Sequence, residues 1–327
     1  MLIRSGLALS LLLGAIGNGS LAEEEKPDLS VILVPVGEFD LGSSENDPAV
    51  DFAVFSDSRR VAVARKSGRI EVFSLPELKK IKELPPIADD IYRIAIAPDG
   101  RHMALLRFRK LPKDEWGKLM LIREVGELLW VSLESGKVEW RRDGINDRTD
   151  SIDISADGSL IALGGTAFKA DEDFVNCGQV LLIDTADGAT RKELLKWLRQ
   201  PVMVVRFSHD GEHLAVGHSK NAAVSIWRLS DLHEEVLYRE DLRDFNDDRG
   251  EITDLCFFDD DRRLAVVGTH EKYSQFSPCT LNSESFLGIW DTENVRPVAF
   301  HTTRDAKFSN VAAAPRLGIV LVSGCCF

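Results

Sequence analysis

The stretch RFSHDGEHLAVGHSKNAAVSIWRL, residues 206–229, holds two apolar runs that flank Asp210-Gly211 and a third run that contains Trp227. Two apolar runs joined by Asp-Gly predict a β-hairpin, because Gly accepts a positive φ and Asp bonds its own backbone in a tight turn. The third run predicts one more strand. The stretch therefore predicts three consecutive antiparallel strands of a small sheet.

The same pattern recurs along the chain. Copies of its first half lie at 53–64, 94–106, 152–164 and 255–268, with a worn copy at 310–324. Copies of its second half lie at 69–75, 127–137, 179–189 and 286–295, and a fourth strand follows, as at 78–84, 137–142 and 234–240. The turn aspartates at 57, 99, 157, 210 and 260 are 42, 58, 53 and 50 residues apart. This length is typical of a propeller blade with loop insertions.

The repeats predict an all-β fold, a β-propeller of four-stranded antiparallel blades with five full blades and an incomplete sixth. Only two strands, within 308–323, follow the fifth unit. The segment LSVILVPVG, residues 29–37, predicts a strand that closes the ring by adding a third strand to the last blade. The alternative is that the chain is a piece of a longer propeller.

These residues resemble the WD40 repeat family over roughly residues 50–324. Trp290-Asp291 matches the WD dipeptide of the family, and Trp227-Arg228 and Ile183-Asp184 each match half of it. The family's Gly-His dipeptide is missing from every unit, and Val216 stands where the family tends to carry Ser or Thr. The resemblance therefore implies the propeller fold, while the hydrogen-bonded His, Ser/Thr, Asp and Trp tetrad of the family does not carry over.

The N-terminal segment predicts export. Arg4 supplies a positive charge, residues 7–16 are apolar, and Ser20-Leu21-Ala22 offers small residues before an acidic run. This is the order of a secretory signal peptide, too short in its apolar part to span a bilayer comfortably. The alternative is an uncleaved anchor. We expect a signal peptide at 1–22, an N-terminal segment with the possible ring-closing strand at 23–49, the propeller at 50–327, and a periplasmic or secreted product.

The charge and the cysteines exclude some classes of function. The formal net charge is −13, spread along the chain, so nucleic acid and anionic membranes are not expected partners. The five cysteines are too few for a disulfide scaffold and lack metal-type spacing. Cys256, in an apolar run, is expected in the core, and an exported chain could pair Cys177 with Cys279.

Loop lengths predict where the chain binds. The long connections are those between second and third strands, at 107–126, 165–178 and 269–285, and those between units, which include 143–150 and 241–250. In a propeller these two classes emerge on one side, here named the long-loop face. Binding residues concentrate on loops held by a rigid scaffold. We therefore expect protein partners on this face.

The residues expected to contact a partner are charged or aromatic residues of these long connections: Arg107, Arg109, Trp116, Asp171, Asp244, Asp248 and His270. Trp116, with cations around it, could anchor an acidic partner, or could simply pack within its own loop. Asp244, Asn246 and Asp248 at alternate positions are weak metal candidates, because oxygens so spaced can gather around Ca²⁺. Gly250 comes one place late for a helical calcium loop, so a solvated acidic loop is the alternative.

No catalytic motif emerges from the sequence. There is no serine in a nucleophile elbow and no phosphate-cradling glycine loop. We therefore expect a non-enzymatic, exported scaffold for protein interaction that needs no cofactor. The alternative is a degenerate propeller enzyme, a hydrolase or oxidoreductase, with a site at the channel mouth on the long-loop face.

Overall fold

The computed structural model describes residues 12–15, 31–32, 47–75, 77, 79–110, 124–145, 148–168, 176–198, 201–219, 223–237, 250–274, 277–294, 296–304, 306–314 and 319–326. All regular elements within these ranges are β-strands, and they form six four-stranded sheets. The predicted all-β class is confirmed. The chain divides into two compact units, Met1–Gly6 with Leu41–Val202 and Leu7–Asp40 with Met203–Phe327, and each is described by itself.

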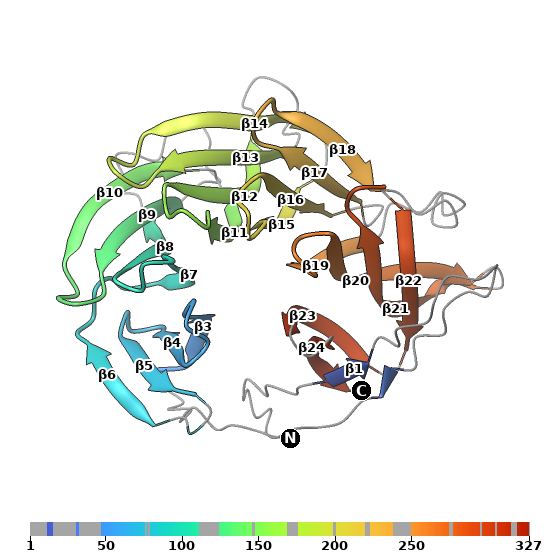
Figure 1. Ribbon diagram of the computed structural model, residues 1–327, viewed down its shortest axis with the longest axis horizontal. Helices are drawn as coiled ribbons and strands as arrows, with labels where there is room; N and C mark the ends of the chain where they lie inside the picture. The colour runs from blue at the N-terminus through green and yellow to red at the C-terminus, as the bar shows by residue number, and fades with distance from the viewer. Residues whose placement is uncertain are drawn as a thin grey trace. The chain divides into compact units, whose positions relative to one another are not determined.

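The first unit holds three sheets of four consecutive strands, named blades 1 to 3 (Figure 1). Blade 1 consists of β3 (Ala49–Val54), β4 (Arg60–Arg65), β5 (Ile70–Ser74) and β6 (Lys80–Leu84). Blade 2 consists of β7 (Ile91–Ile96), β8 (His102–Lys110), β9 (Glu124–Ser132) and β10 (Val138–Ile145). Blade 3 consists of β11 (Arg148–Ile154), β12 (Leu160–Phe168), β13 (Asn176–Asp184) and β14 (Thr190–Leu198).

The second unit holds blades 4 and 5 and a sheet built from both ends of the chain. Blade 4 consists of β15 (Val202–Phe207), β16 (His213–His218), β17 (Val224–Arg228) and β18 (His233–Leu237). Blade 5 consists of β19 (Gly250–Phe258), β20 (Arg263–Ser274), β21 (Ser277–Asp291) and β22 (Arg296–Thr303). The five predicted full blades are thus confirmed.

The incomplete, three-stranded sixth blade is not found in that form. β23 (Ala306–Ala314) and β24 (Ile319–Cys326) pair with β1 (Leu12–Ala15) and β2 (Val31–Ile32) in the order β2-β1-β24-β23. β2 lies within the predicted closing strand, but it reaches β24 only through β1, which comes from the segment predicted as a signal peptide. The difference arises because a short apolar run can pair as an edge strand wherever backbone groups are open.

Alternation along the strands gives each blade two apolar faces. In β9, Leu129 and Val131 pack into a core shared with blade 1, whereas Leu128 and Trp130 pack into a core shared with blade 3. Successive side chains of a strand point to opposite faces, so a strand buried on both sides is apolar at nearly every position. The second unit repeats this: blade 5 packs against blade 4 through one face and against β23 through the other.

The short turns after first strands are formed as predicted. Gly100, Gly158 and Gly211 have φ of 63°, 73° and 74°. In each turn the preceding aspartate accepts a hydrogen bond from the amide two residues further on, as between Asp210 Oδ1 and Glu212 N at 2.8 Å. This is the Asx geometry that makes Asp-Gly a turn signal.

Aspartates of first strands also tie neighbouring blades together. Asp51 Oδ2 of blade 1 accepts a hydrogen bond from Ile94 N of blade 2 at 2.8 Å. Asp254 Oδ2 of blade 5 accepts one from Val311 N of β23 at 3.0 Å, and its Oδ1 binds Arg206 of blade 4 at 2.7 Å. Buried backbone donors require such partners, so these two carboxylates fix the spacing between adjacent sheets.

Parts of the long loops predicted between second and third strands are strands: the two ends of 107–126 and of 165–178, and nearly all of 269–285. β8 runs to Lys110, β12 and β13 pair as far as Phe168 and Asn176, and β20 and β21 pair as far as Ser274 and Ser277. Only two residues, 275–276, separate β20 from β21. A hairpin can extend beyond its sheet through backbone hydrogen bonds alone, without the apolar alternation on which the prediction depended.

Two further expectations concern single residues and membranes. Cys256 packs against the core between blade 5 and β23 as expected, but it is only partly buried, with Sγ 3.3 Å from the carbonyl of Phe257. β19 is a first strand and turns this residue away from the face that packs on blade 4. The side chains of Cys177 and Cys279 lie outside the described ones.

Within the described residues, no helix has the length and apolar character to cross a membrane.

Candidate partner-binding strand ends

The candidate site comprises the ends of second strands and the starts of third strands, here named the long-loop ends of the blades. Three of the predicted partner-binding residues are described there: Arg107 and Arg109 on β8, and His270 on β20. Arg107 and Arg109 lie on the same side of β8, two residues apart. The other predicted residues, Trp116, Asp171, Asp244, Asn246 and Asp248, lie outside the described residues.

Arg107 is held by two carboxylates. Its Nε donates to Glu127, directly opposite on β9, and its Nη1 lies 2.8 Å from Asp89 Oδ1. The Glu127 side chain is only 2% exposed, whereas that of Asp89 is 81% exposed. A buried carboxylate needs a partner of opposite charge, so Arg107 first of all neutralises Glu127.

Arg109 is less firmly engaged. Its Nε lies 3.6 Å from Asp143 Oδ1 of β10, and about a third of its side chain is exposed. Phe108, on the other side of the strand, stacks on Tyr92 of β7 with 4.2 Å between ring centroids. The aromatic pair fixes the strand, so Arg109 projects from a rigid base.

His270 is almost buried, at 8% exposure. Its Nε2 is 3.5 Å from Glu284 Oε2 on the opposite strand, and its ring packs at a tilt against Phe286. Arg304 also reaches Glu284, with 2.6 Å between Nη2 and Oε1. His270 thus belongs to a three-residue charge cluster at the long-loop end of blade 5.

A buried glutamate on the third strand, next to its apolar run, is common to blades 1, 2 and 5. Glu71, Glu127 and Glu284 are 6%, 1% and 7% exposed, and a basic residue of the second strand, Arg65, Arg107 or His270, faces each of them. The sequence analysis missed these glutamates, because an acidic chain offers too many carboxylates to single out three. A usable signal existed: each glutamate stands immediately or almost immediately before an apolar run of a third strand.

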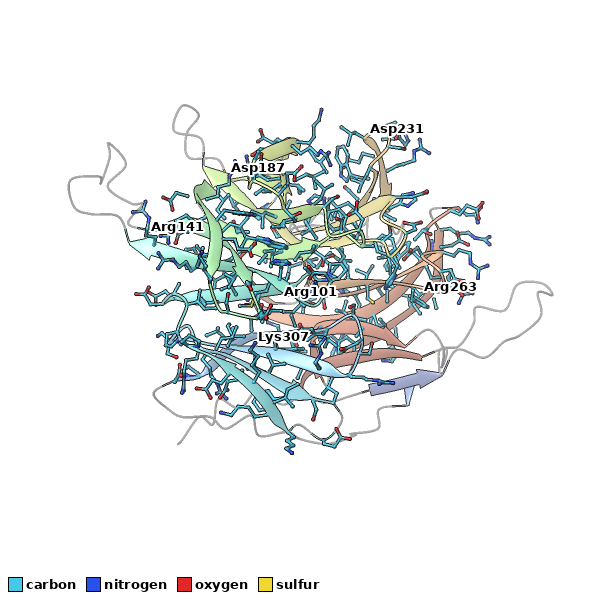
Figure 2. The ribbon with its side chains drawn as sticks, turned by 60° about the vertical axis from the view of Figure 1, so that its left-hand side comes forward. Arg101, Arg141, Asp187, Asp231, Arg263 and Lys307 are labelled. Carbon is cyan, nitrogen blue, oxygen red and sulfur yellow. The ribbon has the colours of Figure 1, made fainter. Side chains whose placement is uncertain are left out.

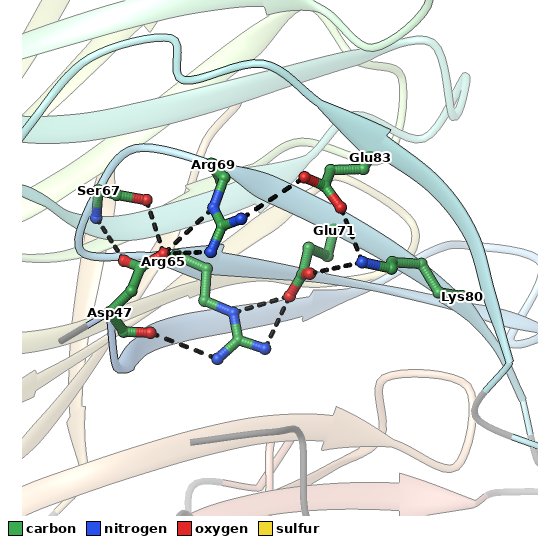
Figure 3. Close-up of polar contacts among 7 residues, drawn as sticks. All are labelled: Asp47, Arg65, Ser67, Arg69, Glu71, Lys80 and Glu83. Carbon is green, nitrogen blue, oxygen red and sulfur yellow. Dashed lines mark hydrogen bonds and ion pairs between the residues drawn. The ribbon is translucent and has the colours of Figure 1, made fainter. Parts of the chain in front are cut away.

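Blade 1 shows the most extensive of these clusters (Figure 3). Arg65 and Lys80 both bind Glu71, at 2.7 and 3.0 Å, and Lys80 also binds Glu83 at 2.7 Å. Burial opposes ionisation of Glu71, but hydrogen bonds from Arg65 and Lys80 outweigh it and hold the pKa of its carboxyl below the ordinary value. The glutamate is therefore charged and compensated at neutral pH.

The same cluster fastens the start of blade 1. Asp47 accepts hydrogen bonds from the amide and hydroxyl of Ser67, both at 2.8 Å, and its Oδ2 lies 2.6 Å from Arg69 Nη2 (Figure 3). Burial again opposes ionisation, and the bonds from Arg69 and Ser67 outweigh it, so the pKa of Asp47 is lowered. Three carboxylates and three cations meet here, so the cluster is electrically balanced and serves to hold the backbone.

Blade 4 carries an uncharged pair at the corresponding place. His218, only 2% exposed, has Nε2 at 3.1 Å from Ser225 Oγ on β17. Burial lowers the pKa of His218 to about 4, so the imidazole is neutral at physiological pH. A histidine and a serine in contact can form a nucleophile and its base, but both side chains are buried and present no reacting surface.

The aromatic residues that carry the family resemblance serve as packing groups. Trp227 and Trp290 are 9% and 4% exposed. Their indole Nε1 atoms have no hydrogen-bond partner within the described part of the chain.

Comparisons with known proteins bear on the fold. No protein-family profile and no curated protein matches the chain. Among solved structures, the chain is similar to Kuenenia stuttgartiensis hydrazine synthase, with 12% identity and a TM-score of 0.56 over 82% of this chain and 71% of that one. It is also similar to U3-55K, with 12% identity and a TM-score of 0.51 over 82% of this chain and 67% of that one.

At this identity the two likenesses concern architecture alone, and together with the sheet topology they support a β-propeller. They do not single out the WD40 family. What the long-loop ends can do chemically follows from their own residues: the buried glutamates have basic partners, and the paired strands that continue beyond them provide backbone donors and acceptors.

Proposed function

We propose that this chain is an exported, non-enzymatic scaffold that binds protein partners through the long-loop ends of its blades. The observation that carries the proposal is the β20–β21 hairpin of blade 5. β19 accompanies β20 only as far as His270, and β22 accompanies β21 only from Ser285 onward. Residues 271–274 and 277–283 thus continue as a two-stranded ribbon beyond the blade.

The ribbon offers what protein recognition uses. Within the described residues, no third strand pairs with either edge of 271–274 and 277–283. Open strand edges present backbone donors and acceptors to which an extended segment of a partner can add. The compensated His270–Glu284–Arg304 cluster lies at the base of the ribbon and keeps that base ordered.

The WD40 relationship and export form the finer part of the proposal. Trp290-Asp291 and the Ser-x-Asp-Gly pattern at 208–211 support descent from WD40-type repeats with a degenerate polar core. The N-terminal pattern at 1–22 supports export. An exported scaffold has no need of the basic patches that nucleic-acid partners require.

The proposal is tested by shortening the ribbon. A variant in which 272–282 are replaced by Asn-Gly is compared with the parent for capture of proteins exported by the same cells. We expect the parent to capture a defined partner and the variant to lose it. Asp99→Asn, in a short turn at the opposite end of blade 2, is the matched control and should leave capture unchanged.

The readout must separate binding from folding. The ribbon variant should unfold at the midpoint of the parent, because within the described residues no third strand pairs with 271–274 or 277–283. Asp99→Asn should do the same, because asparagine keeps the side-chain oxygen that accepts from Arg101 N. Turnover of a small molecule by the purified chain, with no partner captured by the parent, would overturn the proposal in favour of an enzyme.

A further inference from the structure

The short turn of blade 4 brings together three side chains that bind metals. Asp210, Glu212 and His213 each place one ligand atom within 4.8 Å of the other two. Asp210 and Glu212 are exposed and His213 is half-buried. The turn lies at the opposite end of the strands from the long-loop ends and takes no part in the proposed partner binding.

The turn is rigid. Ser208 Oγ donates to Asp210 Oδ1 at 2.5 Å and accepts from His213 N at 2.9 Å, while Asp210 Oδ1 also accepts from Glu212 N at 2.8 Å. These bonds use Oδ1 of Asp210, and within the described residues none is made by its Oδ2.

A neighbouring residue supports the turn from blade 5. Asp261 Oδ2 accepts a hydrogen bond from Asp210 N at 2.9 Å, and Asp261 Oδ1 lies 2.7 Å from Nδ1 of His209. Asp261 is itself 8% exposed at its side chain. The backbone that carries the three ligands is thus held from two sheets, which limits the cost of ordering them around an ion.

In blades 1 and 5 an arginine of the equivalent turn pairs with an aspartate of that turn. Asp57 of blade 1 pairs with Arg60 at 2.7 Å, and Asp259 of blade 5 pairs with Arg262 and Arg263 at 3.2 and 3.4 Å. In blade 2 Asp99 lies 2.6 Å from His102 Nδ1, and Arg101, labelled in Figure 2, stands where blade 4 has Glu212. In the described part of blade 4, no lysine or arginine pairs with Asp210 or Glu212.

Blade 4 therefore has a carboxylate and an imidazole, Glu212 and His213, where the turns of blades 1 and 5 each have two consecutive arginines. We propose that Asp210, Glu212 and His213 bind a divalent transition metal, and that Zn²⁺ is the ion the donors fit best. Zinc takes imidazole nitrogen and carboxylate oxygen together, whereas Ca²⁺ and Mg²⁺ prefer oxygen alone. Three protein ligands leave one coordination position for water or for a donor from a partner.

The test is zinc binding by isothermal titration of the full chain and of matched variants. Glu212→Arg copies the turn of blade 2 into blade 4, and we expect it to remove one zinc equivalent. His213→Gln should weaken that equivalent by roughly tenfold or more. His102→Gln, the corresponding histidine of blade 2, is the control and should bind like the parent, so that zinc held elsewhere in the chain cancels in the comparison.

Three results would overturn the site: the same zinc stoichiometry and affinity in the parent and in Glu212→Arg, no zinc binding by the parent, or tighter binding of Ca²⁺ than of Zn²⁺. Should Glu212→Arg unfold, Asp210→Asn decides instead. It retains the side-chain oxygen that caps the turn while removing the charge, and it should bind zinc more weakly with an unchanged unfolding midpoint.

Discussion

At the scale of one residue, the burial of His218 makes the free energy of unfolding depend on pH. Its pKa is lowered from 6.5 to about 4 because the ring is removed from water. Between pH 6.5 and about 4 the imidazole of His218 is protonated in the unfolded chain and neutral in the folded chain. Its contribution to the free energy of unfolding is therefore fully present above pH 6.5 and is lost as the pH falls toward 4. The loss amounts to about 3 kcal/mol for this depression.

This is measured by urea unfolding at pH 7.0 and at pH 4.5, as the change in free energy of unfolding between the two. His218→Gln should flatten the pH dependence, because glutamine binds no proton. An equal pH dependence in parent and His218→Gln would contradict the assignment.

Two tryptophans allow the contribution of packing to stability to be distinguished from that of the indole hydrogen bond. Trp140 Nε1 donates to the Thr185 carbonyl at 2.8 Å, whereas Trp290 Nε1 has no partner within the described residues. A buried, unpaired donor costs about 1–3 kcal/mol, so removing it offsets much of the packing lost with the indole. We expect Trp290→Phe to destabilise the chain no more than Trp140→Phe, although Trp290 is the more buried residue, and thermal unfolding of the two variants tests this.

Single residues differ in how far the sequence predicts them. Asp99, Asp157 and Asp210 were predictable as turn residues because their bonds are local, made to amides two residues on. Glu127 was not, since its partner Arg107 is twenty residues away and only the strand register brings the two together. The surrounding apolar run marks such a glutamate only once the register is known.

At the scale of elements, the ion pair between the ends of β8 and β9 predicts that removing one of its two charges destabilises the chain much more than removing both. Glu127→Ala leaves Arg107 without its buried partner and should cost roughly 3–5 kcal/mol. The double variant Arg107→Met with Glu127→Leu removes both charges and should recover most of that loss. Denaturant unfolding of the parent, the single and the double variant gives the three values, and a double variant as unstable as the single one would refute the pairing.

The elements themselves were predictable to different degrees. Strands such as β9 and β16 were expected because two apolar faces demand apolar residues at nearly every position. The extensions of β20 and β21 were expected as a loop, since the sequence of residues 271–283 lacks the apolar alternation from which strands were predicted. The extension matters for function, because it converts a predicted long loop into a ribbon with defined edges.

At the scale of the whole molecule, the repeat predicts the number of full blades and the strand order within each. It could not predict the sheet β2-β1-β24-β23, because this sheet joins residues at opposite ends of the sequence and its strands β1 and β2 are four and two residues long. Local pattern determines a blade, whereas pairing of the chain ends depends on whichever segment reaches the open edge.

The predicted export makes this last sheet testable. If residues 1–22 are removed, the mature chain begins at Glu23, loses one positive charge and carries −14 in place of −13. It also loses β1, which pairs with β24 over only the four residues 12–15.

We therefore expect the exported product to begin at Glu23 by N-terminal sequencing, and a chain of residues 23–327 to unfold at a midpoint close to that of the full chain. A product that retains Met1 and stays inside the cell would contradict export. A large loss of stability in 23–327 would show instead that β1 is an integral strand of the folded protein.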